Sequence, residues 1–137
     1  MNSHLFVYGT LLSSTGHPMG ARLRRQARLI GEASIQGLLH DLGRYPGLVE
    51  TADGQARVHG ELYALHDPGA ALIWLDAYEG MVPGCHDQNE YQRAERPVQL
   101  ASGEEVAAWV YLYRKAVGCL PAIPGGRWVG GCSQRDP

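Results

Sequence analysis

Two short stretches of this chain carry the residue types that anion binding and acid–base chemistry require. The first is His4-Leu5-Phe6-Val7-Tyr8-Gly9-Thr10-Leu11, in which an apolar run without helical spacing predicts a buried strand that breaks at Gly9. Because Gly tolerates backbone angles that other residues avoid, a sharp turn is expected there. The turn would direct the amides of Gly9, Thr10 and Leu11 toward one point, beside the Thr10 hydroxyl. This arrangement suits an anion or a developing oxyanion, although most strands that end at Gly-Thr do so for structural reasons alone.

The second stretch is a predicted helix from Ala70 to Glu79. Leu72, Leu75 and Glu79 fall on one face at i, i+3 and i+7, so Glu79 is expected to be carried toward the core at the helix end. Burial disfavours the charged carboxylate, and so does the negative end of the helix dipole. Both effects raise the pKa of Glu79 toward neutral, as a proton-shuttling base requires. The alternative is a Glu that extends into solvent at a frayed end or pairs with an arginine.

The elements that must position these residues are mostly strands. Asp67-Pro68 is typical of a helix start and Gly80 of a helix end, while residues 18–26 predict a short helix or an irregular turn. Residues 52–54 are expected to close a hairpin. Further extended segments are predicted over 29–39, 48–50, 58–65, 91–100 and 106–113. This pattern indicates an α+β fold with a strongly twisted sheet that can close into a small barrel.

Composition and charge exclude several classes of function. The chain has 137 residues and a formal charge of −2, which gives no reason to expect nucleic acid or an anionic membrane as a partner. Its three cysteines do not resemble a disulfide framework, and its histidines lack zinc-like spacing, so no metal is expected. No apolar run is long enough to span a membrane and no signal-peptide pattern is seen, so a cytoplasmic location is expected by default. The oligomeric state is not indicated.

The predicted organisation is one domain over residues 1–117, followed by an irregular Gly/Pro-rich tail over 118–137. Residues 81–90 form a long segment that is either a loop or a lid. Cys85 lies in this segment, and nothing in the sequence around it favours a nucleophile. His59 and His66 are interpreted as surface or sheet residues rather than as catalysts.

Several motifs, taken in order, resemble the γ-glutamylcyclotransferase-like superfamily. The resemblance runs from about residue 5 to residue 113 and leaves the chain from Gly118 onward outside it. The Tyr-Gly-Thr-Leu form of the first motif is most similar to the γ-glutamylamine cyclotransferase branch and its bacterial relatives. The motifs are Phe6-Val7-Tyr8-Gly9-Thr10-Leu11, Gly60-Glu61-Leu62-Tyr63, Leu75-Asp76-Ala77-Tyr78-Glu79-Gly80, Tyr91-Gln92-Arg93 and Ala108-Trp109-Val110-Tyr111-Leu112-Tyr113.

The resemblance implies a small mixed β-barrel with a helix packed at its side, and an enzyme without a cofactor that acts on a small γ-glutamyl substrate. Glu79 matches the catalytic acid/base of the family. Tyr113 matches a family tyrosine that tends to line the pocket. Tyr45 lies in a loop near the pocket mouth and either contacts substrate or packs within a turn. The loop that holds the glutamyl group maps to Tyr8, Gly9, Thr10 and Leu11.

The implied reaction is an intramolecular cyclisation. Glu79 takes a proton from the α-amine of a γ-glutamyl amide, the amine attacks the γ-carbonyl, and Glu79 returns the proton to the leaving amine. The products are 5-oxoproline and a free amine, and the loop amides stabilise the oxyanion or hold the α-carboxylate. Two other functions fit the same residues. One is a non-catalytic module that binds a small carboxylate, and the other is a tailoring enzyme that removes a γ-glutamyl group from a larger scaffold.

Overall fold

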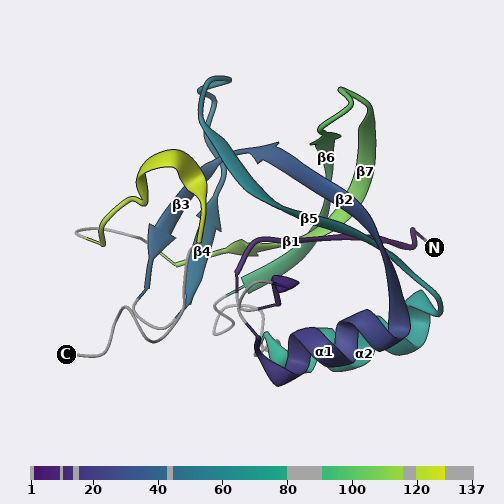
Figure 1. Ribbon diagram of the computed structural model, residues 1–137. Coiled ribbons are helices and arrows are strands. Elements are labelled where there is room, and N and C mark those ends of the chain that lie inside the picture. The colour runs from purple at the N-terminus through teal and green to yellow at the C-terminus, as the bar shows by residue number, and fades with distance from the viewer. Residues whose placement is uncertain are drawn as a thin grey trace.

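A closed barrel of five strands forms the centre of the computed structural model, and two helices pack beside it (Figure 1). The structure describes residues 2–9, 11–13, 16–42, 45–79, 91–115 and 120–128. Around the ring the strands follow the order β1-β5-β2-β6-β7. They span His4–Val7 (β1), Ala27–Gln36 (β2), Arg57–Leu65 (β5), Tyr91–Leu100 (β6) and Glu105–Tyr113 (β7).

The barrel is mixed because its closing pair is parallel. β1 pairs antiparallel with β5 along its whole length, and it meets β7 in parallel orientation at Leu5 and Trp109. The pairs β5–β2, β2–β6 and β6–β7 are antiparallel. The predicted α+β class and the mixed barrel are therefore confirmed.

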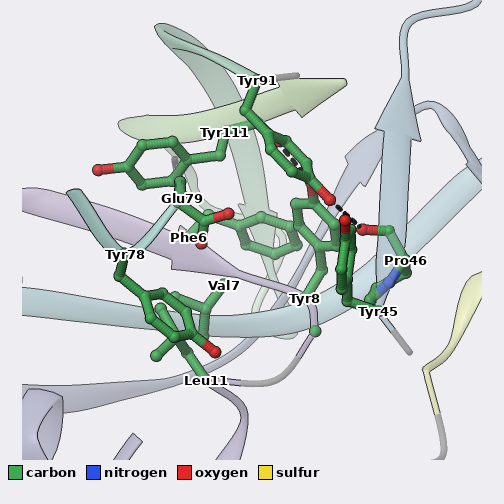
Figure 2. Close-up of a pocket in the computed structure, with 11 residues that line it drawn as sticks. Phe6, Val7, Tyr8, Leu11, Tyr45, Pro46, Tyr78, Glu79, Tyr91 and Tyr111 are labelled. Carbon is green, nitrogen blue, oxygen red and sulfur yellow. Dashed lines mark hydrogen bonds between the residues drawn. The ribbon is translucent and has the colours of Figure 1, made fainter. Parts of the chain in front are cut away.

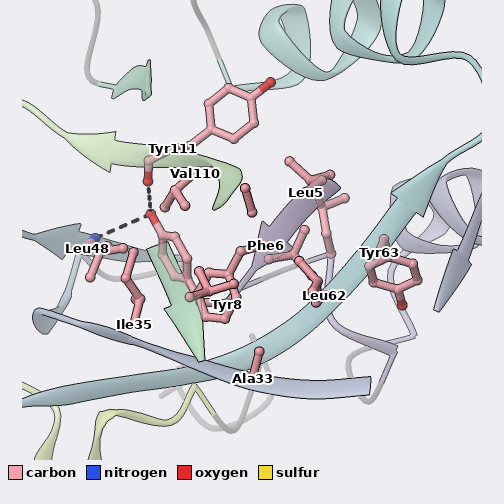
Figure 3. Close-up of a cluster of buried hydrophobic side chains, with 14 of the residues drawn as sticks. Leu5, Phe6, Tyr8, Ala33, Ile35, Leu48, Leu62, Tyr63, Val110 and Tyr111 are labelled. Atoms are coloured by element: carbon pink, nitrogen blue, oxygen red, sulfur yellow. Dashed lines mark hydrogen bonds between the residues drawn. The ribbon is translucent and has the colours of Figure 1, made fainter. Parts of the chain in front are cut away.

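Both faces of β1 are buried, which explains its uninterrupted apolar sequence. Phe6 lies directly opposite Leu62 of β5, and both fill the barrel interior (Figure 3). Leu5 lies opposite Tyr63 on the other face, where both are also fully buried. Arg24 of the first helix interacts with the Tyr63 hydroxyl, so this second face is covered by helix rather than exposed to solvent.

The two helices lie side by side at one end of the barrel (Figure 1). Residues Pro18–Gln26 form a regular helix, α1, so the helical alternative for this segment is correct. Residues Pro68–Tyr78 form α2, which begins as predicted, because the Asp67 side chain accepts a hydrogen bond from the Ala70 amide at 3.2 Å. Trp74 Nε1 donates a hydrogen bond to Gln26 Oε1 at 2.7 Å and joins the helices.

One predicted hairpin is wrong. The extended run expected over 29–39 is divided at Gly37, and β3 (Leu38–Asp41) pairs with β4 (Pro46–Val49) in a separate two-stranded sheet. The turn at 52–54 therefore connects β4 and β5, which lie in different sheets. The local pattern marked these strands correctly, but strand partners are chosen by contacts distant in sequence. At Gly37 an added Cβ would lie 2.6 Å from Leu48 Cδ1, so the absence of a side chain permits this close packing.

Part of the Gly/Pro-rich tail packs on β3 of the two-stranded sheet and, at Gly126, against β5 of the barrel. The Asp41 amide donates to the Pro121 carbonyl at 2.9 Å, and the Ile123 amide donates to the Leu39 carbonyl at 2.7 Å. A short 3₁₀ helix, η2 (Pro124–Gly126), follows, and Trp128 is only 4% exposed. Within the described residues, no helix has the length and apolar character needed to cross a membrane.

Candidate active site

A cavity of about 330 Å³ opens where β1 ends, beside the end of α2 (Figure 2). This volume suits a small molecule. The two stretches that the sequence singled out both contribute to it, although about seventy residues separate them. The lining residues are Phe6, Val7, Tyr8, Gly9, Leu11, Tyr45, Pro46, Tyr78, Glu79, Tyr91 and Tyr111.

The ring of Tyr8 lines the cavity, while its hydroxyl makes hydrogen bonds to neighbouring strands. The hydroxyl donates to the Tyr111 carbonyl at 2.5 Å and accepts from the Leu48 amide at 3.3 Å (Figure 3). Burial raises the pKa of Tyr8 well above its ordinary value, and the nearby charge of Glu79 acts in the same direction. Tyr8 therefore stays neutral and ties β1 to β7 and β4 at the floor of the cavity.

The loop after β1 turns sharply, but not for the reason expected, because Gly9 does not adopt the backbone angles that only glycine tolerates well. The Leu12 amide donates to the Gly9 carbonyl at 3.0 Å and closes the turn. An added Cβ at Gly9 would lie 2.9 Å from the Pro46 ring, so the absence of a side chain allows Pro46 to approach the loop. Gly9 and Leu11 both line the cavity, and Thr10 lies outside the described residues.

A carboxylate on β5 anchors the continuation of this loop. Glu61 accepts hydrogen bonds from the Ser13 amide at 2.9 Å, from the Ser13 hydroxyl at 2.5 Å and from the Tyr63 hydroxyl at 3.1 Å. At the neighbouring Gly60, an added Cβ would lie 2.0 Å from the Val7 carbonyl oxygen. Residues 60–63 thus hold β1 through close packing at Gly60, and the loop after β1 through the hydrogen bonds of Glu61.

Glu79 stands at the C-terminal end of α2 and is carried into the cavity. Its amide donates to the Leu75 carbonyl at 3.0 Å, so its backbone still belongs to the last helical turn. The close-up shows its carboxyl group among the rings of Phe6, Tyr78 and Tyr111 (Figure 2). Burial raises the pKa of Glu79 to about 7, and the negative charge of Asp76 adds to the effect. The direction matches the sequence-based expectation.

Asp76 takes the arginine contact that the alternative interpretation assigned to Glu79. Arg93 Nε donates to Asp76 Oδ1 at 2.8 Å, and Arg93 Nη2 donates to Asp76 Oδ2 at 3.1 Å. The Tyr111 hydroxyl also donates to Asp76 Oδ1, at 2.6 Å. Sequence reasoning missed this cluster, although Asp76, Arg93 and Tyr111 each belong to one of the quoted motifs.

Aromatic rings make up most of the cavity wall. Five of the seven tyrosines of the chain and its single phenylalanine line the cavity. Tyr45 is among them, and the Tyr91 hydroxyl donates to the Pro46 carbonyl at 2.8 Å. Tyr113 is not among the described lining residues. Its ring lies edge-on to Tyr91, with the centroids 5.6 Å apart, whereas Tyr111 of the same strand reaches the cavity. Substrate contact by Tyr113 stays a prediction.

Other sequence expectations concern metals and the segment after α2. In the described ranges, no group of three or more His, Cys, Asp or Glu side chains is placed to hold a metal ion. His59 and His66 belong to β5 and to the residues just after it, and neither lines the cavity. The 81–90 segment, with Cys85, lies outside the described residues.

The barrel, the turn after its first strand and the carboxylate at the helix end define a known class of protein. The family model described as γ-glutamyl cyclotransferase, AIG2-like, matches residues 5–130, and the chain belongs to this family. The matched region extends beyond Tyr113, where the sequence motifs ended, and includes the packed part of the tail.

Individual relatives agree with this assignment. The γ-glutamylcyclotransferase family protein YtfP of Escherichia coli K12 is 34% identical over 126 residues, which cover 91% of this chain and 95% of YtfP. The protein of the same name from Citrobacter rodentium is 35% identical over 126 residues, or 91% of this chain and 94% of its own.

Solved structures share the fold. The solution structure of Escherichia coli YtfP, 34% identical, matches with a TM-score of 0.61 over 92% of this chain and 96% of that protein. The crystal structure of an AIG2-like protein from Mus musculus matches with a TM-score of 0.66 at 24% identity, over 98% of this chain and 95% of the mouse protein.

Proposed function

We propose that this protein is a cyclotransferase that converts γ-glutamyl amines or γ-glutamyl peptides into 5-oxoproline and a free amine, with Glu79 as general acid/base. The observation that carries the proposal is the Glu79 carboxyl group, with a pKa of about 7, in one cavity with the turn at Gly9 and Leu11. Membership of the γ-glutamyl cyclotransferase family supports the same reaction class.

The raised pKa of Glu79 matches the two proton transfers that the reaction assigns to this residue. As a carboxylate, Glu79 accepts a proton from the α-ammonium group of the substrate. The free amine then attacks the γ-carbonyl carbon of the same molecule, which closes a five-membered ring and forms a tetrahedral oxyanion. When the bond between this carbon and the leaving nitrogen breaks, Glu79 returns the proton to that nitrogen, and the second proton of the attacking nitrogen is released to water as the neutral ring amide forms. A group with a pKa near 7 can do both at neutral pH.

The remaining cavity surface is suited to holding rather than reacting with the substrate. Apart from Glu79, the described lining residues are tyrosines, one phenylalanine, aliphatic residues, proline and glycine. None of these carries a charge at neutral pH in its ordinary state. We therefore assign the α-carboxylate or the oxyanion of the substrate to backbone N–H groups of the loop after β1, as the family motif implies.

The substrates to test first are γ-glutamyl amines, because the Tyr-Gly-Thr-Leu motif at Tyr8 is most similar to the γ-glutamylamine cyclotransferase branch. The protein is incubated with γ-glutamyl amines, with γ-glutamyl dipeptides and with larger γ-glutamyl scaffolds, and the release of 5-oxoproline is measured by mass spectrometry. We expect turnover of the small substrates and a loss of about 100-fold or more in Glu79→Gln. Glu50→Gln serves as the control, because Glu50 is exposed, pairs with Arg96 and does not line this cavity.

Three results would contradict the proposal. Full activity in Glu79→Gln would remove the assigned acid/base. Thermal stabilisation by 5-oxoproline or glutamate, without any turnover, would identify a binding module instead. Turnover confined to the larger scaffolds would identify a tailoring enzyme.

A further inference from the structure

We infer that Asp76 is a positioning residue for Glu79: held between Arg93 and Tyr111, its carboxylate places a fixed negative charge beside the acid/base and keeps Glu79 able to exchange a proton at neutral pH. This inference rests on the proposed role of Glu79. It concerns a residue that is not itself among the described residues lining the cavity, although it accepts a hydrogen bond from Tyr111, which is.

Asp76 is fixed by three hydrogen bonds that use both of its oxygens. Oδ1 accepts from the Tyr111 hydroxyl at 2.6 Å and from Arg93 Nε at 2.8 Å, while Oδ2 accepts from Arg93 Nη2 at 3.1 Å. The two-point contact with the guanidinium group is the strongest geometry available to an arginine and a carboxylate. The Asp76 carboxylate therefore has little freedom to turn away from the site.

The groups that hold Asp76 are themselves held by the sheet. Arg93 of β6 and Tyr111 of β7 are directly opposite each other in the antiparallel ladder, so one cross-strand pair supplies all three donors. The Arg93 guanidinium also lies over the Trp109 ring, 4.5 Å from its centroid. Trp109 Nε1 in turn donates to the Asn2 carbonyl at 2.8 Å. The 91–93 and 108–113 motifs thus form a rigid support behind α2.

Asp76 connects this support to Glu79, because both residues belong to the last turn of α2 and its cap. Asp76 and Glu79 are three residues apart, so their side chains are neighbours on the helix surface. Negative charges on two neighbouring side chains repel each other, and this repulsion favours the protonated form of one of the two carboxyl groups. The charge of Asp76 therefore acts against ionisation of the buried Glu79 carboxyl group. In agreement, the charge of Asp76 is the second cause, after burial, of the raised pKa of Glu79.

The other ionisable groups around Glu79 leave this role to Asp76. Burial raises the pKa values of Tyr8, directly after β1, and of Tyr111 on β7, so both are neutral in the working range. Burial opposes the charge of Arg93 on β6, but its hydrogen bonds to Asp76 and the charge of that carboxylate outweigh burial and raise its pKa. Arg93 thus remains a cation. It pairs with Asp76, and its positive charge partly offsets the effect of the Asp76 charge on Glu79.

The test is a direct titration of Glu79 in the full-length protein. Carboxyl ¹³C resonances are followed by NMR from pH 4 to pH 9, and the Glu79 signal is assigned by its loss in Glu79→Gln. Asp76→Asn keeps the side-chain shape and removes the charge, so we expect the Glu79 midpoint to fall by about one pH unit. If turnover is found, the acidic limb of the kcat/KM profile should move by the same amount. Glu50→Gln breaks the other arginine–carboxylate pair of β6, Arg96–Glu50, and should leave the midpoint unchanged.

Arg93→Gln provides the opposite perturbation and covers the case in which Asp76→Asn does not fold. It removes the cation that offsets the field of Asp76, so the Glu79 midpoint should rise. If Asp76 and Arg93 only hold α2 against the sheet, both variants should be less stable. The Glu79 midpoint should then not shift in opposite directions in the two variants. An unchanged or raised midpoint in folded Asp76→Asn, or an unchanged or lowered one in Arg93→Gln, would overturn the inference. Because NMR detects the proton on Glu79 without turnover, an inactive protein that shows both shifts would refute the proposed function alone.

Discussion

At the scale of single residues, Glu79 satisfies two requirements that oppose each other. Proton exchange near neutral pH needs a carboxyl group with a raised pKa, and burial together with Asp76 provides it. The same surroundings make the ionised carboxylate unfavourable in the folded protein. The raised pKa that the proposed role of Glu79 requires is therefore obtained at the expense of stability, and the size of that loss depends on pH.

The stability of the Glu79→Gln variant should reveal this conflict. In the unfolded chain Glu79 ionises near its ordinary pKa of 4.5, whereas in the folded protein it keeps its proton up to about pH 7. Between these values the folded state binds more protons than the unfolded state, so the Glu79 contribution to stability falls as pH rises and levels off above 7. Gln has no such titration, so the variant should gain on the order of 1–3 kcal/mol over the wild type between pH 4.5 and pH 8.

Urea denaturation of both proteins at a series of pH values measures this difference. Glu50→Gln is again the matched control. Its hydrogen bond with Arg96, which outweighs a slight burial, lowers the pKa of Glu50, so its removal should give no such gain above pH 5. A Glu79→Gln advantage that is constant across the pH range would contradict a raised pKa in the folded state.

Glu79 could be predicted from the sequence because its signal is local. Its spacing from Leu72 and Leu75 places it on the buried face of a helix, and both leucines are buried in the structure. The role of Asp76 could not be predicted in the same way. Its partners, Arg93 and Tyr111, belong to strands whose register with α2 has no local signature.

At the scale of the elements, β5 is the strand that holds β1 and the loop after it. It pairs with β1 on one side and β2 on the other, and Glu61 on the same strand holds the loop after β1 through Ser13. At Gly60, β1 lies very close to β5: an added Cβ would lie 2.0 Å from the Val7 carbonyl oxygen and 2.9 Å from Phe6 Cζ. The position of β1 and of the loop that follows it thus depends on the absence of a side chain at residue 60.

The Gly60→Ala variant should therefore be strongly destabilised. A backbone oxygen at this distance cannot turn aside as a flexible side chain can, so β1 must shift away from β5. We expect a loss of more than about 2 kcal/mol in the free energy of unfolding, or failure to fold. Gly54→Ala is the control, because an added Cβ there meets nothing within 4 Å, and its effect should lie within about 0.5 kcal/mol. Equal stabilities of the two variants in urea denaturation would show that β1 is not constrained at this crossing.

The sequence was informative about which segments are strands and less so about their partners. Tyr91–Leu100 was predicted with the observed bounds, and β7 to within one residue. The hairpin assigned to residues 52–54 was wrong because a turn-forming sequence marks a change of direction and does not specify which strands pair. β4 takes β3 as its partner, and this choice places Pro46 at the mouth of the cavity.

At the scale of the whole molecule, the described part of the tail behaves as a component of the fold. Residues 120–128 have no hydrophobic period, so nothing in their pattern predicted packing. Their attachment uses backbone hydrogen bonds to β3, which leave no trace in side-chain type, and one buried indole, Trp128. The family match through residue 130 agrees with this view.

The Trp128→Ala variant tests how much the tail contributes. Removal of a buried indole should lower the free energy of unfolding by about 3 kcal/mol or more. Leu120→Ala in the same segment is the control, because Leu120 is 37% exposed, and it should cost less than about 1 kcal/mol. Differential scanning calorimetry would show the loss as a lower Tm. Wild-type stability in Trp128→Ala would mean that the barrel is complete without the tail.

The parallel contact between β1 and β7 has a consequence for the order of events during synthesis. The barrel closes only when the first strand of the chain meets the last, and the Tyr8–Tyr111 hydrogen bond spans 103 residues. Contacts of such long range are slow to form, because the entropy of loop closure must be overcome before they add stability. A nascent chain that has not yet released β7 from the ribosome lacks one wall of the cavity and the partner that fixes Asp76. The cavity therefore cannot be complete before β7 is available, and the proposed activity is expected only of chains that include this strand.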